Sequence, residues 1–566
     1  MGYLTEYVVN GDGPWGAEEV AHLYRRAAFG GTTFERDVAQ GVQTQSGLRM
    51  AVDRLVDFAP EDPHLDRRGG GSAGYGAPLH ALPNDESDLG QVKHGHLLIP
   101  LQAHWLYRMR YTTQPFQEMF TLFLHNHMPT EWDKVFGGIS RHVIKGNNGS
   151  DPNEQCSGGP LGFDQDRRKQ MVYDVIRTQN YLYRQTGIDS FHNLLMNITR
   201  DPCMLLYLDN VDNQKGRPQE NFARELMELF SMGVDNGYTE TDIQEIAKVL
   251  TGETLPFRDC DGNYDYRTYG FDPSIHEGGN KAVFGRIIQE DFNGGETEQL
   301  IDLILEQVSV NPDVRGLPAP YNDLPAVAVF MSWKILRWFV SDSVQLYPVP
   351  DEPVLELAHY MRGTDNAPYP ARRYPYDLRA CMRKVFLSKY FFAPENRYTM
   401  IKSPTDFYVT TLRGLELDDQ FSYINGPGKR MQNMGMELFE PPNVSGWRGG
   451  EGWVSAGKLV ERFNYGDYLF WHVMSRTAEF RGKWGAWLNN MIADPTTEIS
   501  GVNDIEGMID FVCRRLLHQP PNESERTQLK DFLVEFPSFR QGMAKFDERM
   551  RCLLHLVMSM PRFQLK

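Results

Sequence analysis

Two histidines at the end of an apolar run have the residue type and spacing that could bind a metal ion. The run FTLFLHNHMPTEW, residues 120–132, has the pattern of a helix that carries His125 and His127 and ends before Pro129. Glu118 lies about two helical turns before His125 on the same stripe, because steps of three and four residues return to one side of a helix. Two imidazoles and a carboxylate are a competent ligand set for a divalent transition metal. The alternative is that both histidines cap and pack the helix end, where a cationic imidazole stabilises the last carbonyls.

A second polar cluster lies in the segment QENFARELMELF, residues 219–230. As a helix, this segment places Arg224, Glu225 and Glu228 along one polar stripe. Arg224 has the planar fork that binds a carboxylate or another anion through two hydrogen bonds. Glu225 and Glu228 are candidate metal ligands, or a candidate catalytic acid and base. The structural alternative is a buried ion-pair network that fixes the geometry of the helix.

Alternating oxygen donors occur in the loop FRDCDGNYDYRTYGFD. Gly262 allows a tight turn among them, and oxygens at every second position of a turning loop suit calcium coordination. The glutamate that closes an EF-hand loop is missing at the expected position, so a simple turn rich in Asp and Asn is the alternative. The candidate calcium ligands are Asp259, Asp261, Asn263 and Asp265.

Two further loops carry residue types that bind ligands. His276 lies shortly before two glycines and is either a third imidazole for the histidine site or a solvent-facing side chain. The segment EPPNVSGWRGGEGW, residues 440–453, carries Trp447 and Trp453 on a loop stiffened by prolines. Such indoles form a surface for a carbohydrate or a partner protein, or they plug the helical core beneath the loop.

Helices must position these groups, because helical periodicity dominates the chain and strand-like alternation is short and rare. We therefore predict a mainly α, large multi-helical protein with long irregular loops and few short strands. The predicted regions are an N-terminal helical segment (1–66), a glycine-rich flexible connection (67–91), a central helical core (92–400) and a C-terminal helical region with the tryptophan- and glycine-rich loop (401–566). The predicted helices span residues 18–29, 93–110, 115–127, 166–184, 219–232, 240–251, 297–308, 324–340, 352–361, 378–388, 456–474, 504–517, 524–532 and 540–558.

The composition excludes several classes of protein. The 566 residues are 41% hydrophobic and 23% charged, as expected of a globular protein, with a net charge of -17 that argues against nucleic-acid binding. No run approaches the roughly 18 apolar residues of a membrane helix, and the first residues show no export signal. Six dispersed cysteines without a CxxC pair exclude zinc-knuckle and thioredoxin-type motifs. Walker, dinucleotide-binding and GxSxG motifs are also missing from the sequence.

Several long motifs follow one another in a recognisable order along the chain. They are HLYRRAAFG (22–30), the HNH block (125–127), DPCMLLYLDN (201–210), ENFARELMELF (220–230), YTETDIQEIAKVLTG (238–252), FDPSIHEGGNKAVFG (271–285), IKSPTDF (401–407) and LFEPPNVSGWRGGEGWV (438–454). In these blocks the sequence resembles the bacterial family called domain of unknown function 1800 (DUF1800). The resemblance implies a commonly exported protein, often encoded beside a sulfatase- or phosphatase-like partner, and implies no particular activity. Two positions depart from the family pattern, because Leu124 replaces an aromatic residue and Glu253 replaces a tryptophan.

Two functional hypotheses follow from these residues. The first is a metal-dependent enzyme, hydrolytic rather than redox, in which the histidine pair and Glu118 hold a divalent cation. In that enzyme Glu225 or Glu228 is a ligand or general base, and Arg224 binds an anionic group of the substrate. The second is a non-catalytic binding or assembly protein of the cell envelope, which contacts the sulfatase-like partner through the loop that carries the two tryptophans.

Overall fold

Helices dominate the fold, which confirms the predicted fold class. The computed structural model describes residues 2–59, 98–145, 165–255, 268–308, 321–363, 375–416, 427–473, 478–493, 499–535 and 541–566. Within these ranges, none of the helices combines the length and the apolar character needed to cross a membrane.

The helices of the first half of the chain are short to medium in length. They are α1 (Ala17–Ala27), α2 (Thr33–Gln40), α3 (Gln45–Val56), α6 (Leu98–Tyr111), α7 (Pro115–His127), α8 (Trp132–Lys145), α9 (Gln165–Thr186), α10 (Phe191–Thr199), α11 (Pro202–Tyr207), the 3-10 turn η3 (Asn210–Asp212), α12 (Glu220–Glu225), the π-helix η4 (Leu226–Ser231), α13 (Glu240–Val249) and α14 (Glu296–Glu306).

The second half of the chain is also mainly helical. Its helices are α15 (Ala326–Phe339), α16 (Glu352–Arg362), α17 (Leu378–Phe386), α18 (Lys389–Phe392), η6 (Pro394–Asn396), α19 (Pro404–Leu415), α21 (Pro427–Asn433), η7 (Gly450–Trp453), α22 (Ala456–Asp467), η8 (Tyr468–Val473), α23 (Ala478–Ala493), α24 (Ile505–Leu516), α25 (Glu523–Glu535), α26 (Met543–Ser559) and α27 (Pro561–Gln564).

Helix starts follow local sequence signals. Helix α7 has proline at its first position and spans the residues that the periodicity predicts. The block IKSPTDF is a capping box, in which Ser403 and Asp406 exchange hydrogen bonds at the start of α19. The helix predicted at 219–232 is in fact α12 followed by the π-helix η4. The periodicity does not predict α2, α3, α8, α10 or α19, several of which are short and gain their stability from packing.

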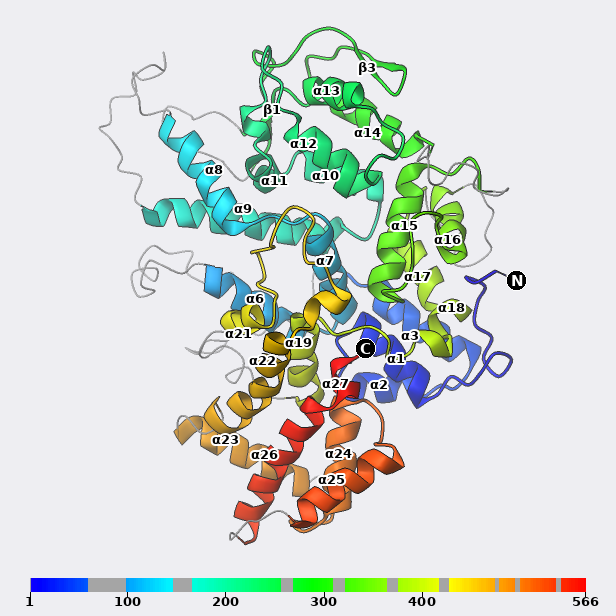
Figure 1. Cartoon of the computed structure of the whole chain (residues 1–566), viewed down its shortest axis with the longest axis vertical. Helices are drawn as coiled ribbons and strands as arrows, with labels where there is room; N and C mark the ends of the chain where they lie inside the picture. The colour runs from blue at the N-terminus through cyan, green and yellow to red at the C-terminus, as the bar shows by residue number, and fades with distance from the viewer. Residues whose placement is uncertain are drawn as a thin grey trace.

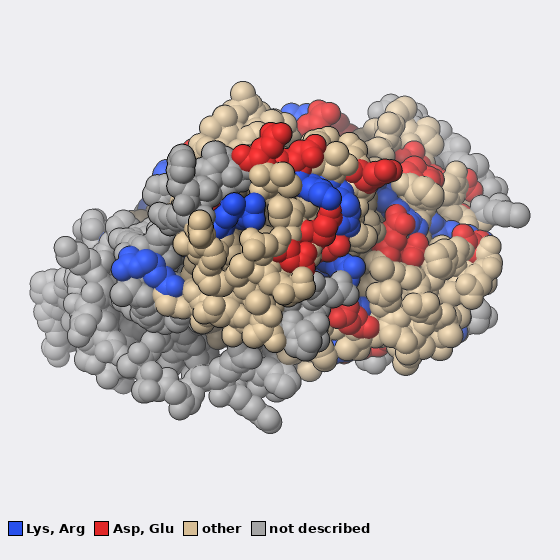
Figure 2. Space-filling view, turned by 90° about the horizontal axis from the view of Figure 1, so that it is seen from below, with Lys and Arg blue, Asp and Glu red and all other residues tan. Residues whose placement is uncertain are grey.

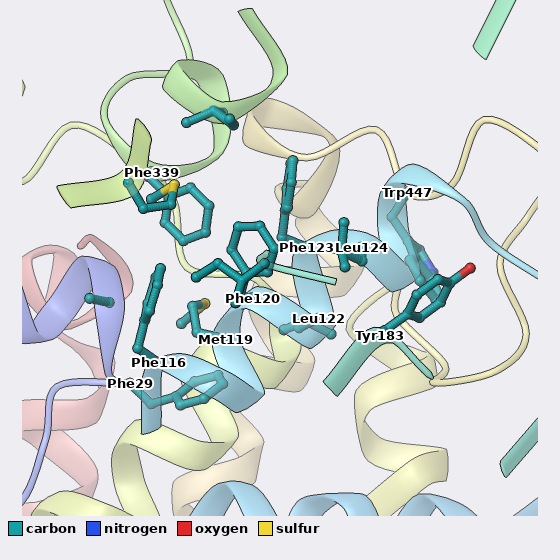
Figure 3. Packing of buried hydrophobic residues seen from close by; sticks show 14 of the residues in the cluster. Phe29, Phe116, Met119, Phe120, Leu122, Phe123, Leu124, Tyr183, Phe339 and Trp447 are labelled. Carbon is teal, nitrogen blue, oxygen red and sulfur yellow. The ribbon is translucent and has the colours of Figure 1, made fainter. Parts of the chain in front are cut away.

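Helix α7 lies at the centre of the hydrophobic core. Its residues are buried on every side apart from the half-buried Asn126, and the buried set includes polar side chains such as Gln117 and Glu118. Phe116 and Phe120 pack against Phe339 of α15, and Phe116 also contacts Phe386 of α17. Figure 3 shows Phe116, Phe120 and Phe339 among these packed side chains. The core therefore fixes α7 and α15 relative to one another.

The described strands form two small antiparallel sheets. Strand β1 (Glu253–Thr254) pairs with β2 (Gly270–Phe271), and β3 (Lys281–Val283) pairs with β4 (Arg286–Ile288). The β3–β4 hairpin turns at Phe284 and Gly285, which have φ of 53° and 72°. Two successive positive φ values match the right-handed twist of the flanking strands.

The segments far apart in sequence meet in the middle of the molecule. Helices α10–α14 and the small sheets lie at one end, α23–α26 lie at the other, and α7 and α15 lie between them (Figure 1). The loop before α22, drawn in yellow, crosses in front of α7 in the same view. Figure 2 shows acidic and basic side chains interspersed on the face seen from below.

Candidate functional site

The first two residues of the HNH block join the end of α7 to the loop that carries the two tryptophans. His125 Nε2 accepts a hydrogen bond from the Phe439 N–H at 3.2 Å, and Asn126 Oδ1 accepts one from the Trp447 N–H at 2.8 Å. Gly446 has φ of 74°, and a Cβ there would lie 2.2 Å from the carbonyl oxygen of Asn126, so this approach needs glycine. Burial lowers the pKa of His125 to about 3. His125 is therefore a neutral packing residue with its Nε2 lone pair already engaged.

The third residue of the block, His127, keeps one ring nitrogen available. Its Nε2 lies 3.0 Å from the carbonyl oxygen of Phe230 in η4. Because a carbonyl only accepts, Nε2 carries the proton and Nδ1 holds the lone pair. Nδ1 is buried and has no hydrogen-bond partner among the described residues. Burial and the nearby charge of Lys334 keep the pKa of His127 well below its usual value, against the effect of the Phe230 carbonyl.

Glu118 does not contribute to a site with these histidines. Arg184 donates to it from Nε at 2.8 Å and from Nη2 at 2.9 Å, Arg108 Nε donates at 3.2 Å, and Trp105 Nε1 at 2.9 Å. Burial alone would raise the pKa of Glu118, but the two guanidinium groups outweigh it and hold the pKa below its usual value. The Glu118 carboxylate is therefore fully buried and forms structural ion pairs with Arg108 and Arg184. Across the described ranges, no three His, Cys, Asp or Glu side chains are placed to hold one metal ion.

Arg224 forms a surface network rather than an open anion site. Its guanidinium lies 2.5 Å from Glu240, 3.2 Å from Glu220 and 3.6 Å from Glu228. Burial and the charge of Glu228 raise the pKa of the half-buried Glu225. Arg224 is thus paired with Glu220 and Glu228 of its own segment and with Glu240 of α13, whereas Glu225 forms no salt bridge with a described residue. The same sequence block contacts His127 through its backbone, by the carbonyl oxygen of Phe230. Phe230 lies in the π-helical turn η4, and π-helical turns are frequent at functional sites.

His276 is neither solvent-facing nor a partner of the other histidines. It is buried, with Nδ1 at 2.6 Å from the carbonyl oxygen of Thr251 and Nε2 at 3.1 Å from Glu296, which also binds Lys281 at 2.8 Å. Burial lowers the pKa of His276, but the bonds to Glu296 and Thr251 outweigh it and the pKa is raised overall. Glu253, at the position of the family's usual tryptophan, is a buried carboxylate in β1. His276 therefore belongs to a closed polar network.

Some of the predicted features lie outside the described residues. These are the glycine-rich connection and two of the cysteines, Cys156 and Cys260. The other four cysteines are free thiols, of which three are buried and Cys552 is partly buried. The candidate calcium ligands Asp259, Asp261, Asn263 and Asp265 also lie outside the described residues.

The polar and aromatic residues that do converge line a cavity of about 290 Å³. We call it the tryptophan cavity. Its walls come from the end of α7, one face of α15, the residues before α19 and the loop that carries the two predicted tryptophans. Three of the sequence blocks therefore meet here, namely HNH, IKSPTDF and the tryptophan loop. The principal lining residues are Asn126, His127, Trp333, Lys334, Arg337, Trp338, Asp342, Ser403, Asp406, Trp447, Arg448, Trp453 and Lys566.

Helix α15 supplies the wall that the sequence analysis does not identify. Trp333, Lys334, Arg337 and Trp338 line the same side of the helix, because the second adjacent pair follows the first by four residues, about one turn. The segment SWKILRWF contains a signal that could have revealed them. Two tryptophans and two cations recur at helical spacing within a helix that is otherwise strongly apolar, and such a stripe is unusual for a core-facing surface.

Cations of the tryptophan cavity lack the carboxylate partners that the surface cations have. Among the described residues, the side chains of Lys334, Arg337 and Arg448 make neither a salt bridge nor a hydrogen bond. Burial, and then the charge of Arg337, lower the pKa of Lys334 to about 8. Burial raises the pKa of Asp342 against the effect of nearby cations.

Several polar atoms of the cavity wall are also unpaired. Trp338 Nε1, Asp406 Oδ1 and His127 Nδ1 are buried without a hydrogen-bond partner in the described part of the chain. The other Asp406 oxygen binds Lys566 Nζ at 2.7 Å. Trp447 and Trp453 are only 6% and 5% exposed, so their indoles line the cavity instead of projecting from the loop. An unpaired donor, an unpaired acceptor and free cations together favour a bound polar ligand.

Comparison with known proteins agrees with the sequence blocks over most of the chain. A search of curated proteins and a search of solved structures each return no match. A family model described as "Protein of unknown function (DUF1800)" matches residues 163–565. The blocks at residues 22–30 and 125–127 precede the matched range, whereas the IKSPTDF block, the tryptophan loop and α15 lie within it. Because the match covers most of its length, the chain belongs to the DUF1800 family.

Proposed function

We propose that the protein binds a small organic anion in the tryptophan cavity. The ligand carries an anionic group, such as a sulfate, phosphate or carboxylate, next to a flat or ring-shaped apolar part. The observation that supports this most is the presence of Lys334, Arg337 and Arg448 in one cavity, with no carboxylate within salt-bridge distance of their charged groups. Lys334 and Arg337 are half-buried and Arg448 is exposed, so the cavity presents three cations with which a ligand of opposite charge can pair.

The aromatic lining defines the rest of the ligand. Four indoles, those of Trp333, Trp338, Trp447 and Trp453, face a volume of about 290 Å³, near the lower end for small-molecule sites. Indole faces favour flat rings and sugar faces, and an indole N–H donates one hydrogen bond. His127 Nδ1 offers an acceptor, which suits a hydroxyl or amide donor on the ligand. A small ring with one anionic substituent and one hydrogen-bond donor satisfies these groups together.

We propose hydrolysis only as a reaction of the ligand that is bound in this cavity. Its metal-binding form needs Glu118, which is occupied by two arginines, and His125, whose Nε2 accepts a backbone hydrogen bond. A hydrolytic role at the tryptophan cavity would instead use the side chains that line it. The envelope-assembly hypothesis requires Trp447 and Trp453 to meet a partner, and their burial favours the small-molecule role.

Calorimetric titration with three matched compounds tests the proposal. 4-Nitrophenyl sulfate and 4-nitrophenyl phosphate carry the anion and the ring, whereas 4-nitrophenyl glucoside carries the ring without the charge. We expect saturable one-to-one binding of at least one anionic compound and about tenfold weaker binding of the neutral one. Appearance of yellow 4-nitrophenol in the same samples reports whether a bound ester is hydrolysed.

A pair of lysine variants locates the binding. Lys334→Met removes the cavity charge, whereas Lys215→Met removes an exposed lysine far along the chain from any cavity residue. We expect Lys334→Met to weaken binding of the anionic compound by about tenfold or more and Lys215→Met to leave it unchanged. Equal affinity in the wild type and both variants, or no preference for the anionic compounds, would contradict the proposal.

A further inference from the structure

A second group of buried donors lies at the end of α1, separate from the residues that line the tryptophan cavity. Arg25 is 3% exposed, and its Nε, Nη1 and Nη2 atoms are all buried with no hydrogen-bond partner in the described residues. Its guanidinium carbon lies 4.0 Å from the centre of the Tyr398 ring. The hydroxyl of Tyr398 is itself buried without a partner. Burying a guanidinium with none of its donors satisfied is strongly unfavourable, so the group requires an explanation.

His518 and Lys402 belong to the same group. His518 follows α24, and both of its ring nitrogens are buried without a hydrogen-bond partner among the described residues. Its backbone adopts φ of 62°, which is uncommon outside glycine, and a Cβ at Gly30 would lie 2.2 Å from its ring. Lys402 is 2% exposed, and its Nζ lies 4.0 Å from the centre of the Phe563 ring. Within the described ranges, the side-chain polar groups of Arg25, Tyr398, His518 and Lys402 form no hydrogen bond.

The positive charges of Arg25 and Lys402 act on the neighbouring groups. Burial, followed by the charges of Arg36, Lys402 and Arg25, lowers the pKa of His518 well below its usual value. Burial and the charge of Arg25 likewise lower the pKa of Lys402, against the effect of Asp406. Arg25, Lys402 and His518 therefore lie close enough to influence one another, and Arg25 packs on the Tyr398 ring.

The neighbouring carboxylates are already committed to other cations. Glu18 and Glu19 bind Arg397 at 3.0 and 3.1 Å. Glu525 binds Arg562 at 2.7 Å, and the Arg562 guanidinium also contacts the Tyr398 ring. Asp406 binds Lys566 at 2.7 Å. In the described residues, no carboxylate is within salt-bridge distance of Arg25 or Lys402.

We propose that Arg25, Tyr398, Lys402 and His518 form an internal binding site for a small inorganic anion. The guanidinium, hydroxyl, ammonium and imidazole groups all donate hydrogen bonds, and an anion of halide or oxyanion type accepts from all of them. Ordered water would satisfy hydrogen bonds but would leave the charge of Arg25 uncompensated. The site joins α1, the segment before α19 and the turn after α24. A bound anion therefore stabilises the contact between the N-terminal helices and the C-terminal half.

Thermal unfolding in bromide tests this site. Purified full-length protein is melted at constant ionic strength, with sodium gluconate replaced stepwise by sodium bromide and, in a second series, by sodium phosphate. Because bromide does not stabilise proteins by exclusion from their surface, a rise in Tm with bromide reports specific binding. We expect Tm to rise by ~1–2 °C for each tenfold excess of anion over its Kd in at least one series.

Three variants make the test specific. Arg25→Met and Lys402→Met keep the aliphatic stems and remove the charges, and they should melt at or above the wild-type Tm in gluconate without the anion-dependent rise. Arg286→Met, on an exposed side chain, should retain the rise. In crystals grown in bromide, we expect an anomalous peak between Arg25 and Lys402. If neither anion raises the wild-type Tm more than it raises the Tm of Arg25→Met, or if bromide binds only at the surface as an adventitious ion, the site does not exist.

Discussion

The α12 network and the α15 wall of the tryptophan cavity use similar residues in opposite ways. Around α12, Arg224 lies within 3.6 Å of three carboxylates, and its side chain is about one-third exposed. On α15, Lys334 and Arg337 are half-buried and form no salt bridge with any described residue. Arg224, in the more recognisable sequence block, is therefore paired with carboxylates, whereas the cations of α15 form no salt bridge with a described residue. A charged residue indicates a ligand site when its charge is left uncompensated by the fold.

The largest expected effect comes from breaking a compensated buried charge. Glu118→Gln leaves Arg108 and Arg184 buried without their carboxylate, and we expect a loss of about 3–5 kcal/mol in the free energy of unfolding. Chemical denaturation measures this loss. Arg224→Met, which disrupts the exposed network, should change stability very little by comparison. Similar losses in the two variants would remove the distinction between buried and surface compensation.

Lys334→Met should have the opposite sign, because it removes a half-buried charge that makes no salt bridge with a described residue. We expect the free energy of unfolding at pH 7 to increase by about 1–3 kcal/mol. The pKa of Lys334 is about 8 in the folded protein, below the usual value for lysine, so the unfolded chain binds more protons between pH 8 and 10.5. The wild type should therefore gain stability relative to Lys334→Met as pH rises through this window. A loss of stability in the variant at every pH would mean that Lys334 is compensated.

His125 of the HNH block provides a smaller test. With a pKa of about 3, His125 stays neutral in the folded protein while it takes up a proton in the unfolded chain below pH 6.5. Stability attributable to His125 is therefore present above pH 6.5 and decreases by about 1 kcal/mol between pH 6 and 5. His125→Gln retains a hydrogen-bond acceptor for the Phe439 N–H and should flatten this part of the stability profile. An unchanged slope would contradict the buried neutral assignment.

Trp338→Phe should have the smallest effect. The substitution keeps an aromatic ring in the cavity and removes the indole N–H that has no partner in the described protein. We expect no loss of stability and a reduction of about threefold to tenfold in affinity for the best 4-nitrophenyl anion. Trp487→Phe is the matched control, because the Trp487 N–H donates to the Leu415 carbonyl away from the cavity. Equal affinity of Trp338→Phe and the wild type would remove the indole N–H from the proposed binding groups.

The sequence predicts the elements better than it predicts their partners. Proline at the first position and a continuous apolar pattern are sufficient to define α7, and helical periodicity is sufficient for the mainly α fold. The pairing of Glu118 with Arg184 joins α7 to α9, and no local pattern contains that information. The π-helical turn at η4 is likewise invisible to a 3.6-residue periodicity.

The candidate site shows the same limit. His127, Trp447 and Trp453 are identified from residue type, and the structure brings them to one cavity, although as buried lining and not as an exposed docking surface. Lys334 and Arg337 are missed because cations within an apolar helix have the pattern of ordinary snorkelling side chains. Only the three-dimensional arrangement reveals which of them lack a carboxylate partner.

Our central proposal is that the tryptophan cavity binds an organic anion with a flat or ring-shaped part against α15. The most direct test is a crystal of the wild-type protein soaked in 4-bromobenzenesulfonate, in which anomalous scattering from bromine locates the ring. We predict a bromine peak among the indoles of the cavity, with the sulfonate within hydrogen-bond distance of Lys334 or Arg337. A cavity that stays free of the compound while it binds elsewhere on the protein would contradict the claim.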